Sequence, residues 1–170
     1  MTVSAPSLVV NGADDSFRDL VDSLILFAAQ IQKVRQVLST AMGVTQPQYN
    51  ILMILAHQRS RQSITVKKLA EHMNVTPSYV VVETNRLLAQ GLLRKETGEE
   101  DRREINLQLT DAAVRLIANA GPLQRCVNDA LFGGLSKGDF KSLSHTIKML
   151  IARYEPTMGE AKEFVSKSSN

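Results

Sequence analysis

The sequence predicts a mainly helical protein with one small β-hairpin, and three observations support this fold class. Apolar residues recur at spacings of three and four along most of the 170 residues, as they do on helices with one buried face. A polar turn with helix-capping residues separates two short helical segments near Asn74. Farther on, Ile105 to Leu109 alternates apolar and polar residues, which is typical of a half-buried strand.

The first predicted helix runs from about Asp15 to Met42. Its apolar stripe consists of Phe17, Leu20, Leu24, Phe27, Ile31, Val34 and Leu38. Val21, Ile25 and Leu26 widen that stripe beyond one face, so we expect packing partners on more than one side. The residues before Asp15 have no basic region of the kind that opens a secretory signal, and they predict a loose arm.

The next two helices are predicted from their ends. The second begins at Thr45, which forms a capping-box pattern with Gln48, and it stops before the polar run at Arg59. A short third helix follows Thr65. It ends at Asn74, a residue type that tolerates the left-handed conformation of a helix terminus.

The third and fourth predicted helices together indicate a helix-turn-helix. Thr76 is its N-cap, Pro77 its first residue, and it continues to Gln90 before ending at Gly91. A helix-turn-helix needs a small residue at the crossing, a turn residue and apolar residues that lock the helices together. The residues that fit are Ala70, Asn74, Val75 and Val80. Other helical corners share this pattern, so the segment that follows decides between them.

That segment predicts a β-hairpin, and a helix-turn-helix followed by a hairpin is a winged helix-turn-helix. Two short runs, 92–97 and 104–110, flank a polar loop that contains Gly98. A fifth helix opens with Thr110-Asp-Ala-Ala and ends at the Gly133-Gly134 pair. In such a fold the second helix of the pair enters the DNA major groove, and the hairpin tip reaches the minor groove.

A sixth helix and a polar tail complete the predicted organisation. Ser136 with Asp139 caps the sixth helix, and after Pro156 the chain turns polar. Its apolar stripe consists of Phe140, Leu143, Ile147, Leu150 and Ile151.

The charge distribution favours an anionic partner for the middle of the chain. Net charge is +3, but residues 57–95 carry seven basic side chains against two acidic ones, hence +5, which leaves −2 for the rest. A local positive field suits double-stranded DNA. A solvated helix surface is the alternative explanation of the same charges. The basic residues are Arg59, Arg61, Lys67, Lys68, Arg86, Arg94 and Lys95.

Several other classes of protein are disfavoured. The chain has no nucleotide-binding glycine motif, no hydrolase or metalloprotease motif and no facing carboxylate pair, so we expect no enzyme and no cofactor. One cysteine, Cys126, and three scattered histidines predict no metal site. A single cysteine indicates a reducing compartment, hence the cytoplasm, and its apolar surroundings predict a buried, unreactive thiol. No apolar run is long enough for a membrane-spanning helix, so we expect no interaction with a membrane.

Four segments resemble the MarR family of bacterial winged-helix regulators, and the wing with its Asp-x-Arg…Leu-Thr pattern is the most specific of them. The segments are Val44-Thr-Gln-Pro-Gln-Tyr-Asn-Ile-Leu52, Leu69-Ala-Glu-His-Met73, Arg86-Leu-Leu-Ala-Gln-Gly-Leu-Leu-Arg94 and Asp101-Arg-Arg-Glu-Ile-Asn-Leu-Gln-Leu-Thr-Asp111. The resemblance implies a homodimer that represses promoters at pseudo-palindromic operators and is released by a small ligand or by oxidation.

This resemblance also organises the chain into five parts. They are a flexible N-terminal arm (1–14), a dimerisation helix (15–43), a winged helix-turn-helix DNA-binding domain (44–110), C-terminal dimerisation helices (111–155) and a polar tail (156–170).

The predicted DNA-binding residues lie on the fourth helix, next to it and in the wing. With Val80 on the buried face of a helical wheel, Asn85 and Val82 point outward, where they would read adenine and a thymine methyl. Ser78 and Arg86 suit phosphates. The full set is Lys68, Thr76, Ser78, Val82, Asn85, Arg86, Asp101, Arg102 and Arg103.

In the wing, the family motif maps its minor-groove arginine to Arg103 and the residue that positions it to Asp101. Alternatively, Arg102 and Arg103 pair with Glu99, Glu100 or Glu104. A winged helix used for protein–protein interaction is the alternative function, which Val81, Val82 and Glu83 would favour.

The resemblance places a small effector, such as an aromatic acid or its thioester, between the winged helix and the dimerisation helices. The candidate residues there are Phe27, Met42, Tyr49, Met53 and His57. Each of them could equally be ordinary core packing.

Overall fold

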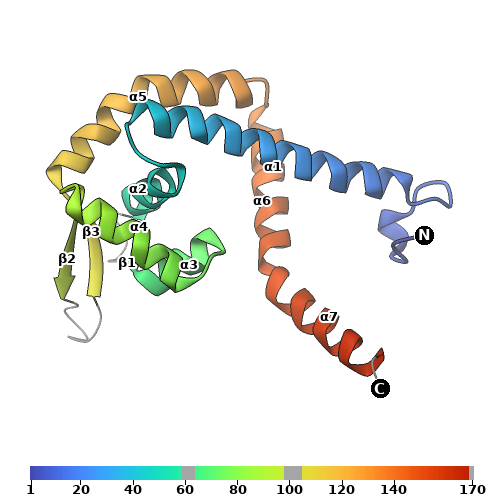
Figure 1. Ribbon diagram of the computed structural model, residues 1–170. Coiled ribbons are helices and arrows are strands. Elements are labelled where there is room, and N and C mark those ends of the chain that lie inside the picture. The colour runs from blue at the N-terminus through green and yellow to red at the C-terminus, as the bar shows by residue number, and fades with distance from the viewer. Residues whose placement is uncertain (59–63, 98–104, 169–170) are drawn as a thin grey trace. The chain divides into compact units, whose positions relative to one another are not determined.

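The computed structural model describes residues 1–58, 64–97 and 105–168, and it is built from helices and one small three-stranded sheet (Figure 1). The mainly helical fold class predicted from the sequence is confirmed. The chain divides into two compact units, residues 1–125 and residues 126–170.

The first unit contains the winged helix-turn-helix. Its elements are η1 (Pro6–Leu8), α1 (Asp15–Ala41), α2 (Gln46–Gln58), β1 (Ile64–Thr65), α3 (Val66–Met73), α4 (Pro77–Ala89), β2 (Leu93–Thr97), β3 (Ile105–Leu109) and the beginning of α5 (Asp111–Phe132). Before α1, the arm contacts the helix start, because Thr2 donates from its backbone N–H and its hydroxyl to the buried Asp14 carboxylate. These hydrogen bonds lower the pKa of Asp14.

The turn between α3 and α4 has the predicted geometry. Asn74 adopts φ 52° and ψ 48°, the left-handed conformation, and the Val75 N–H donates to the Ala70 carbonyl at 3.1 Å. Thr76 caps α4 by accepting from the Tyr79 N–H at 3.3 Å. Val75, however, was expected to lock the two helices together, and this is wrong: its side chain is 37% exposed.

The sheet has the strand order β1-β3-β2, with both pairs antiparallel. The predicted hairpin is the β2–β3 pair, in which Leu93 faces Leu109 across the ladder. The sequence did not reveal β1, which pairs Ile64 with Leu107. A strand of two residues is too short to show an alternating pattern, and its pairing with β3 joins segments more than 40 residues apart.

A continuous core fixes α4 in place. Its largest fully buried side chains come from α2, α3, α4 and β3, at most 2% exposed. They are Ile51, Leu52, Leu69, Val80, Leu87 and Leu107. The helix therefore presents one defined face to solvent.

The second unit comprises the end of α5, α6 (Lys137–Ala152) and α7 (Tyr154–Ser168). The predicted capping box of α6 is confirmed: the Asp139 N–H donates to Ser136 Oγ at 3.1 Å, and the Ser136 N–H donates to Asp139 Oδ2 at 3.2 Å. Bonds from the Ser136 side chain and backbone lower the pKa of Asp139.

The polar tail predicted after Pro156 is a helix instead, α7. Pro156 lies in its first turn, where a missing N–H costs nothing. A Glu163–Lys167 ion pair at 2.6 Å, spaced by four residues, supports the last turn. Polar composition therefore hid a helix. Across the described ranges, no helix combines the length and the apolar character that crossing a membrane requires.

Candidate nucleic-acid interface

The fourth helix, α4, has two distinct faces. Val80, Glu83, Thr84 and Leu87 are buried, and the Thr84 hydroxyl donates to the Val80 carbonyl at 2.8 Å. The rest of its surface is solvent-exposed or half-buried. The helical wheel therefore placed Thr84 and Leu87 beside Val80 correctly. Gly91, which it put on the same face, is exposed, and Glu83 was not assigned.

The residues expected to contact DNA lie on the exposed face. Ser78, Val82, Asn85 and Arg86 are all exposed, with Val82 at 49%. Two further apolar side chains share this surface, Tyr79 at 41% and Val81 at 42%. The exposed face is thus polar at its ends and apolar in between. Contact of these residues with DNA stays a prediction.

Two more predicted contacts flank this face. Lys68 is exposed on α3, and Thr76 is exposed at the start of α4 with its hydroxyl already used in capping. In the described part of the chain, neither Lys68 nor its neighbour Lys67 forms an ion pair. Both ammonium groups are therefore available to phosphates.

Glu83 is the interface residue that sequence reasoning missed. It is 5% exposed, and its Oε1 accepts from Arg86 Nη1 at 2.7 Å. The signal was present, because position 83 lies three residues after Val80 and four before Leu87, on the same side of the helix. An acidic residue type argued against burial there.

The tip of the wing lies outside the described residues. This holds for Asp101, Arg102 and Arg103 and for the glutamates that would pair with them in the alternative, Glu99, Glu100 and Glu104.

The stem of the wing is described, and it carries a polar network on one face. Arg94 donates to Gln108 Oε1 at 2.8 Å and forms an ion pair with Glu96 at 3.1 Å, while the Gln108 amide donates to Glu96. Arg94 is thus already paired with an acid, whereas its neighbour Lys95 is exposed and forms no ion pair among the described residues, so the stem keeps one cation for phosphates.

The candidate effector residues differ in their environments. Met42 and Tyr49 are buried at 6% exposure each, Phe27 and Met53 are half-buried, and His57 is exposed. His57 is therefore not enclosed with the others in this chain.

Around Tyr49 the structure brings together polar groups that the sequence did not indicate. Burial raises the pKa of the Tyr49 hydroxyl, and the nearby Arg35 charge and a hydrogen bond with Gln124 partly offset this effect. The Gln124 amide also lies 3.3 Å from Met53 Sδ, and Arg35 Nη1 donates to Asn50 Oδ1 at 3.1 Å. Side chains from α1, α2 and α5, namely Arg35, Tyr49 and Gln124, therefore form one polar cluster.

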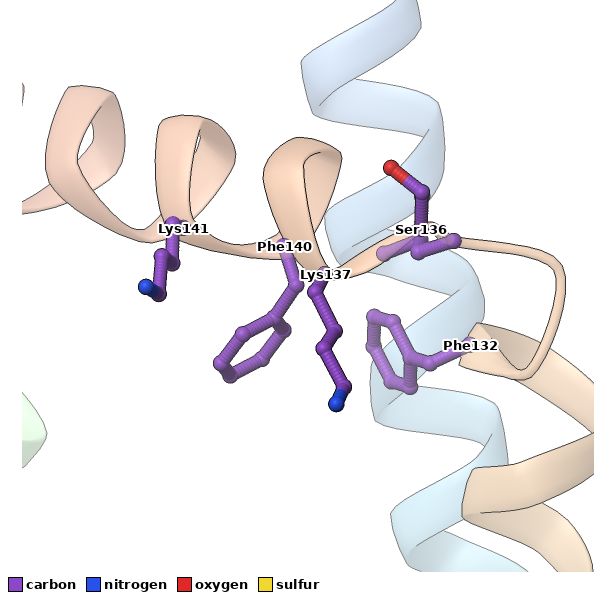
Figure 2. A pocket seen from close by; sticks show the side chains of 6 residues that line it. Phe132, Ser136, Lys137, Phe140 and Lys141 are labelled. Atoms are coloured by element: carbon purple, nitrogen blue, oxygen red, sulfur yellow. The ribbon is translucent and has the colours of Figure 1, made fainter.

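A cavity of about 350 Å³ lies within the second unit, at the start of α6. Figure 2 shows the Lys137 side chain beside the rings of Phe132 and Phe140. The lining residues are Phe132, Leu135, Ser136, Lys137, Phe140 and Lys141. Sequence reasoning treated the preceding Gly133-Gly134 pair only as a helix break.

Cys126 departs from expectation. Its thiol was predicted to be buried, but the structure places it at the surface of this chain. The apolar neighbours that suggested burial are themselves largely exposed, including Leu123 at 36% and Leu131 at 39%. Where the chain is described, no three His, Cys, Asp or Glu side chains come together as metal ligands.

A core-anchored helix-turn-helix followed by a two-stranded wing defines the winged helix-turn-helix class. Residues 44–105 match the model of the MarR family. This match confirms, over the winged helix-turn-helix, the resemblance to the family that the sequence motifs predicted.

Individual relatives agree with this resemblance. The chain is 33% identical over 102 residues to the HTH-type transcriptional repressor MdtR of Bacillus subtilis, an alignment that covers 60% of this chain and 64% of MdtR. The chain thus spans less than two-thirds of that relative's length.

Two solved structures share the fold. The transcriptional regulator PA3341 is 26% identical with a TM-score of 0.67, over 78% of this chain and 97% of PA3341. CouR from Rhodococcus jostii RHA1, solved with p-coumaroyl-CoA, has a TM-score of 0.70 at 18% identity, over 78% of this chain and 92% of CouR.

Proposed function

We propose that this protein is a sequence-specific DNA-binding regulator that acts in the cytoplasm as a homodimeric repressor and is released by a small ligand. The exposed face of α4 carries the proposal. A helix held by a fully buried core offers Ser78, Val82 and Asn85 to a partner in a fixed orientation. That arrangement suits insertion into a major groove, where base edges are read at hydrogen-bond distance.

Within this proposal, different residues have different tasks. The Asn85 amide pairs with adenine, and the Val82 methyl groups pack on a thymine methyl. Ser78, Arg86 and Lys68, with Thr76 beside them, contact phosphates and so set the position of the helix without reading sequence. Arg103 in the wing inserts into the adjacent minor groove, with Asp101 and Arg102 beside it.

The dimer follows from apolar surface that a single chain leaves in contact with water. On α1, Leu20, Ile25 and Leu26 are 54–64% exposed. In the second unit, Phe140 and Ile151 are 61% and 68% exposed, and none of its described residues is buried. A second copy covers such surfaces, and a two-fold dimer places two recognition helices about 34 Å apart, one helical turn of DNA.

For the ligand, the cluster of polar side chains around Tyr49 is a better-supported binding position than the exposed His57. The Tyr49 hydroxyl is hydrogen-bonded with Gln124, whose amide also contacts the half-buried Met53, and this mixture of a polar and an apolar contact suits a molecule with an aromatic ring and one polar end. That CouR was solved with p-coumaroyl-CoA favours testing aromatic acids and their thioesters first. The similarity to MdtR, which is a transcriptional repressor, supports the repressor role.

The test is a selection of bound sequences from random duplex DNA with the full chain, followed by affinity measurements over a salt series. We expect a two-fold symmetric site that binds about 10³-fold or more tighter than random duplex. Aromatic acids and their thioesters, added to the complex, should then release the DNA.

Two outcomes would contradict the proposal. Enrichment of no sequence, with weak binding that vanishes as salt rises, would favour the protein–protein interaction module instead. Specific binding by a monomer would contradict the dimer alone. The variant Asn85→Ala serves as the internal check, since it should lower operator affinity while leaving random-duplex affinity unchanged.

A further inference from the structure

A buried acidic side chain in the middle of a DNA-reading helix needs a physical reason. Glu83 shares the core face of α4 with Val80, Thr84 and Leu87, and its side chain is 6% exposed. Its Oε2 is buried and has no hydrogen-bond partner among the described residues. Burial of a carboxylate is costly unless a partner compensates it.

The compensating partner is Arg86, one turn farther along α4. Arg86 Nη1 donates to Glu83 Oε1 at 2.7 Å, a charge-assisted hydrogen bond. The two partners differ in exposure, because the Arg86 side chain is 60% exposed while Glu83 is enclosed by the protein. A buried, fixed anion therefore holds a solvent-facing cation.

This pairing has two consequences for a helix that approaches DNA. The guanidinium loses rotamer freedom before DNA arrives, so a contact it makes in the right geometry costs less entropy. The pair also carries no net charge, so Arg86 contributes less to general attraction by phosphates than a lone cation does. Lys67 and Lys68, which form no ion pair in the described part of the chain, keep that general role.

We propose that Glu83 is a positioning residue for Arg86 that raises the ratio of operator to random-DNA affinity. The carboxylate fixes the direction of the guanidinium, so that Arg86 meets its phosphate in good geometry only where α4 is seated at a matched site, and it neutralises the charge that would attract DNA in general. This inference rests on the proposed function, because it requires α4 to bind DNA.

The experiment compares full-length variants on the selected operator and on a random duplex over a salt series. Glu83→Gln keeps an oxygen that accepts from Arg86 but removes the negative charge. Random-duplex affinity should rise by roughly three- to tenfold and the salt slope should steepen by up to about one unit, with a smaller gain on the operator. The operator-to-random ratio therefore falls.

Glu71→Gln is the matched control. It removes one acid from the exposed surface of α3, where the described chain shows no ion pair for Glu71. Both affinities should shift by the same small factor, and the ratio should stay at the wild-type value. A Glu83→Gln protein that behaves like Glu71→Gln would overturn the inference.

A second test separates action through Arg86 from a general effect of charge. In an Arg86→Gln background, which keeps a donor for the buried carboxylate, Glu83→Gln should no longer change the ratio. A change of the same size in that background would overturn the inference. The melting temperature of the Glu83→Gln single variant should equal or exceed that of the wild type, because a buried neutral amide costs less free energy than a buried charge.

Arg86→Lys gives a readout that does not depend on folding of the Glu83 variant. It keeps the charge and loses the planar fork, so the ratio should fall while the salt slope stays constant. An unchanged ratio would count against positioning. If the wild-type protein itself shows no operator preference, the proposed function fails first, and this inference fails with it.

Discussion

The turn between α3 and α4 allows a prediction in which two similar substitutions have different effects. Asn74 is held at φ 52° and ψ 48°, where a Cβ atom clashes with the following carbonyl. Asn tolerates this region better than Ala, so Asn74→Ala should cost about 1 kcal/mol of unfolding free energy. Asn74→Gly removes the clash, but glycine loses roughly 0.5–1 kcal/mol more in chain entropy on folding, so the net change is close to zero.

A matched position in the helix interior should show the opposite order. Glu71 is exposed in α3, three residues before the turn. There Ala is favoured over Gly by about 1 kcal/mol, because the backbone is right-handed helix. The Ala-to-Gly preference should thus reverse between residues 71 and 74.

Urea denaturation at one fixed protomer concentration measures these differences without interference from assembly. The difference between Asn74→Gly and Asn74→Ala corresponds to roughly 2–4 °C in melting temperature for a chain of this size. Operator affinity of Asn74→Gly should equal that of the wild type, since the helix crossing is unchanged. If Asn74→Ala proves as stable as Asn74→Gly, the left-handed turn and the helix-turn-helix geometry built on it are refuted.

The remaining predictions concern DNA contact and assembly. Asn85→Ala should relax discrimination at one base pair by about 1–3 kcal/mol, measured by competition between single-base operator variants. An equal loss of affinity for random DNA would mean that Asn85 does not face the bases. Val82→Ala should abolish the penalty for replacing one thymine by uracil. Arg103→Ala should weaken operator binding by about 1–3 kcal/mol with stability unchanged, whereas unaltered affinity would favour pairing with nearby glutamates. Leu24→Asp or Ile147→Asp should dissociate or unfold the dimer in sedimentation experiments, and a wild-type monomer at micromolar concentration would contradict the assembly itself.

Features determined by neighbouring residues were predictable from the sequence. The capping residues Thr76 and Ser136 and the left-handed Asn74 all depend on backbone groups within four positions, and the structure has each of them as expected. The exposed face of α4 was equally accessible, because helical periodicity and one buried anchor, Val80, fix every other position.

Features determined by distant contacts were not predictable. The strand β1 exists only through its pairing with β3, and the exposure of Val75 follows from tertiary packing that residue type alone does not determine. Burial of Glu83 is a different case, because its helical position indicated the buried face while its acidic residue type argued against burial. Cys126 is exposed in a segment whose apolar residues, including Leu123 and Leu131, are partly exposed as well.

The ion pairs of the winged helix-turn-helix also bear on how tightly it holds DNA in general. Two of its exposed arginines are already neutralised, Arg86 by Glu83 and Arg94 by Glu96. Each phosphate contact by a free cation adds about 0.9 to the salt slope, so neutralised arginines reduce that slope while Lys67, Lys68 and Lys95 maintain it. Apolar Val81 and Val82 at the centre of the exposed face add area without charge. Affinity in this protein should therefore depend more on base contacts and on the spacing of the two half-sites than on charge, and a weak salt dependence should accompany strong sequence preference.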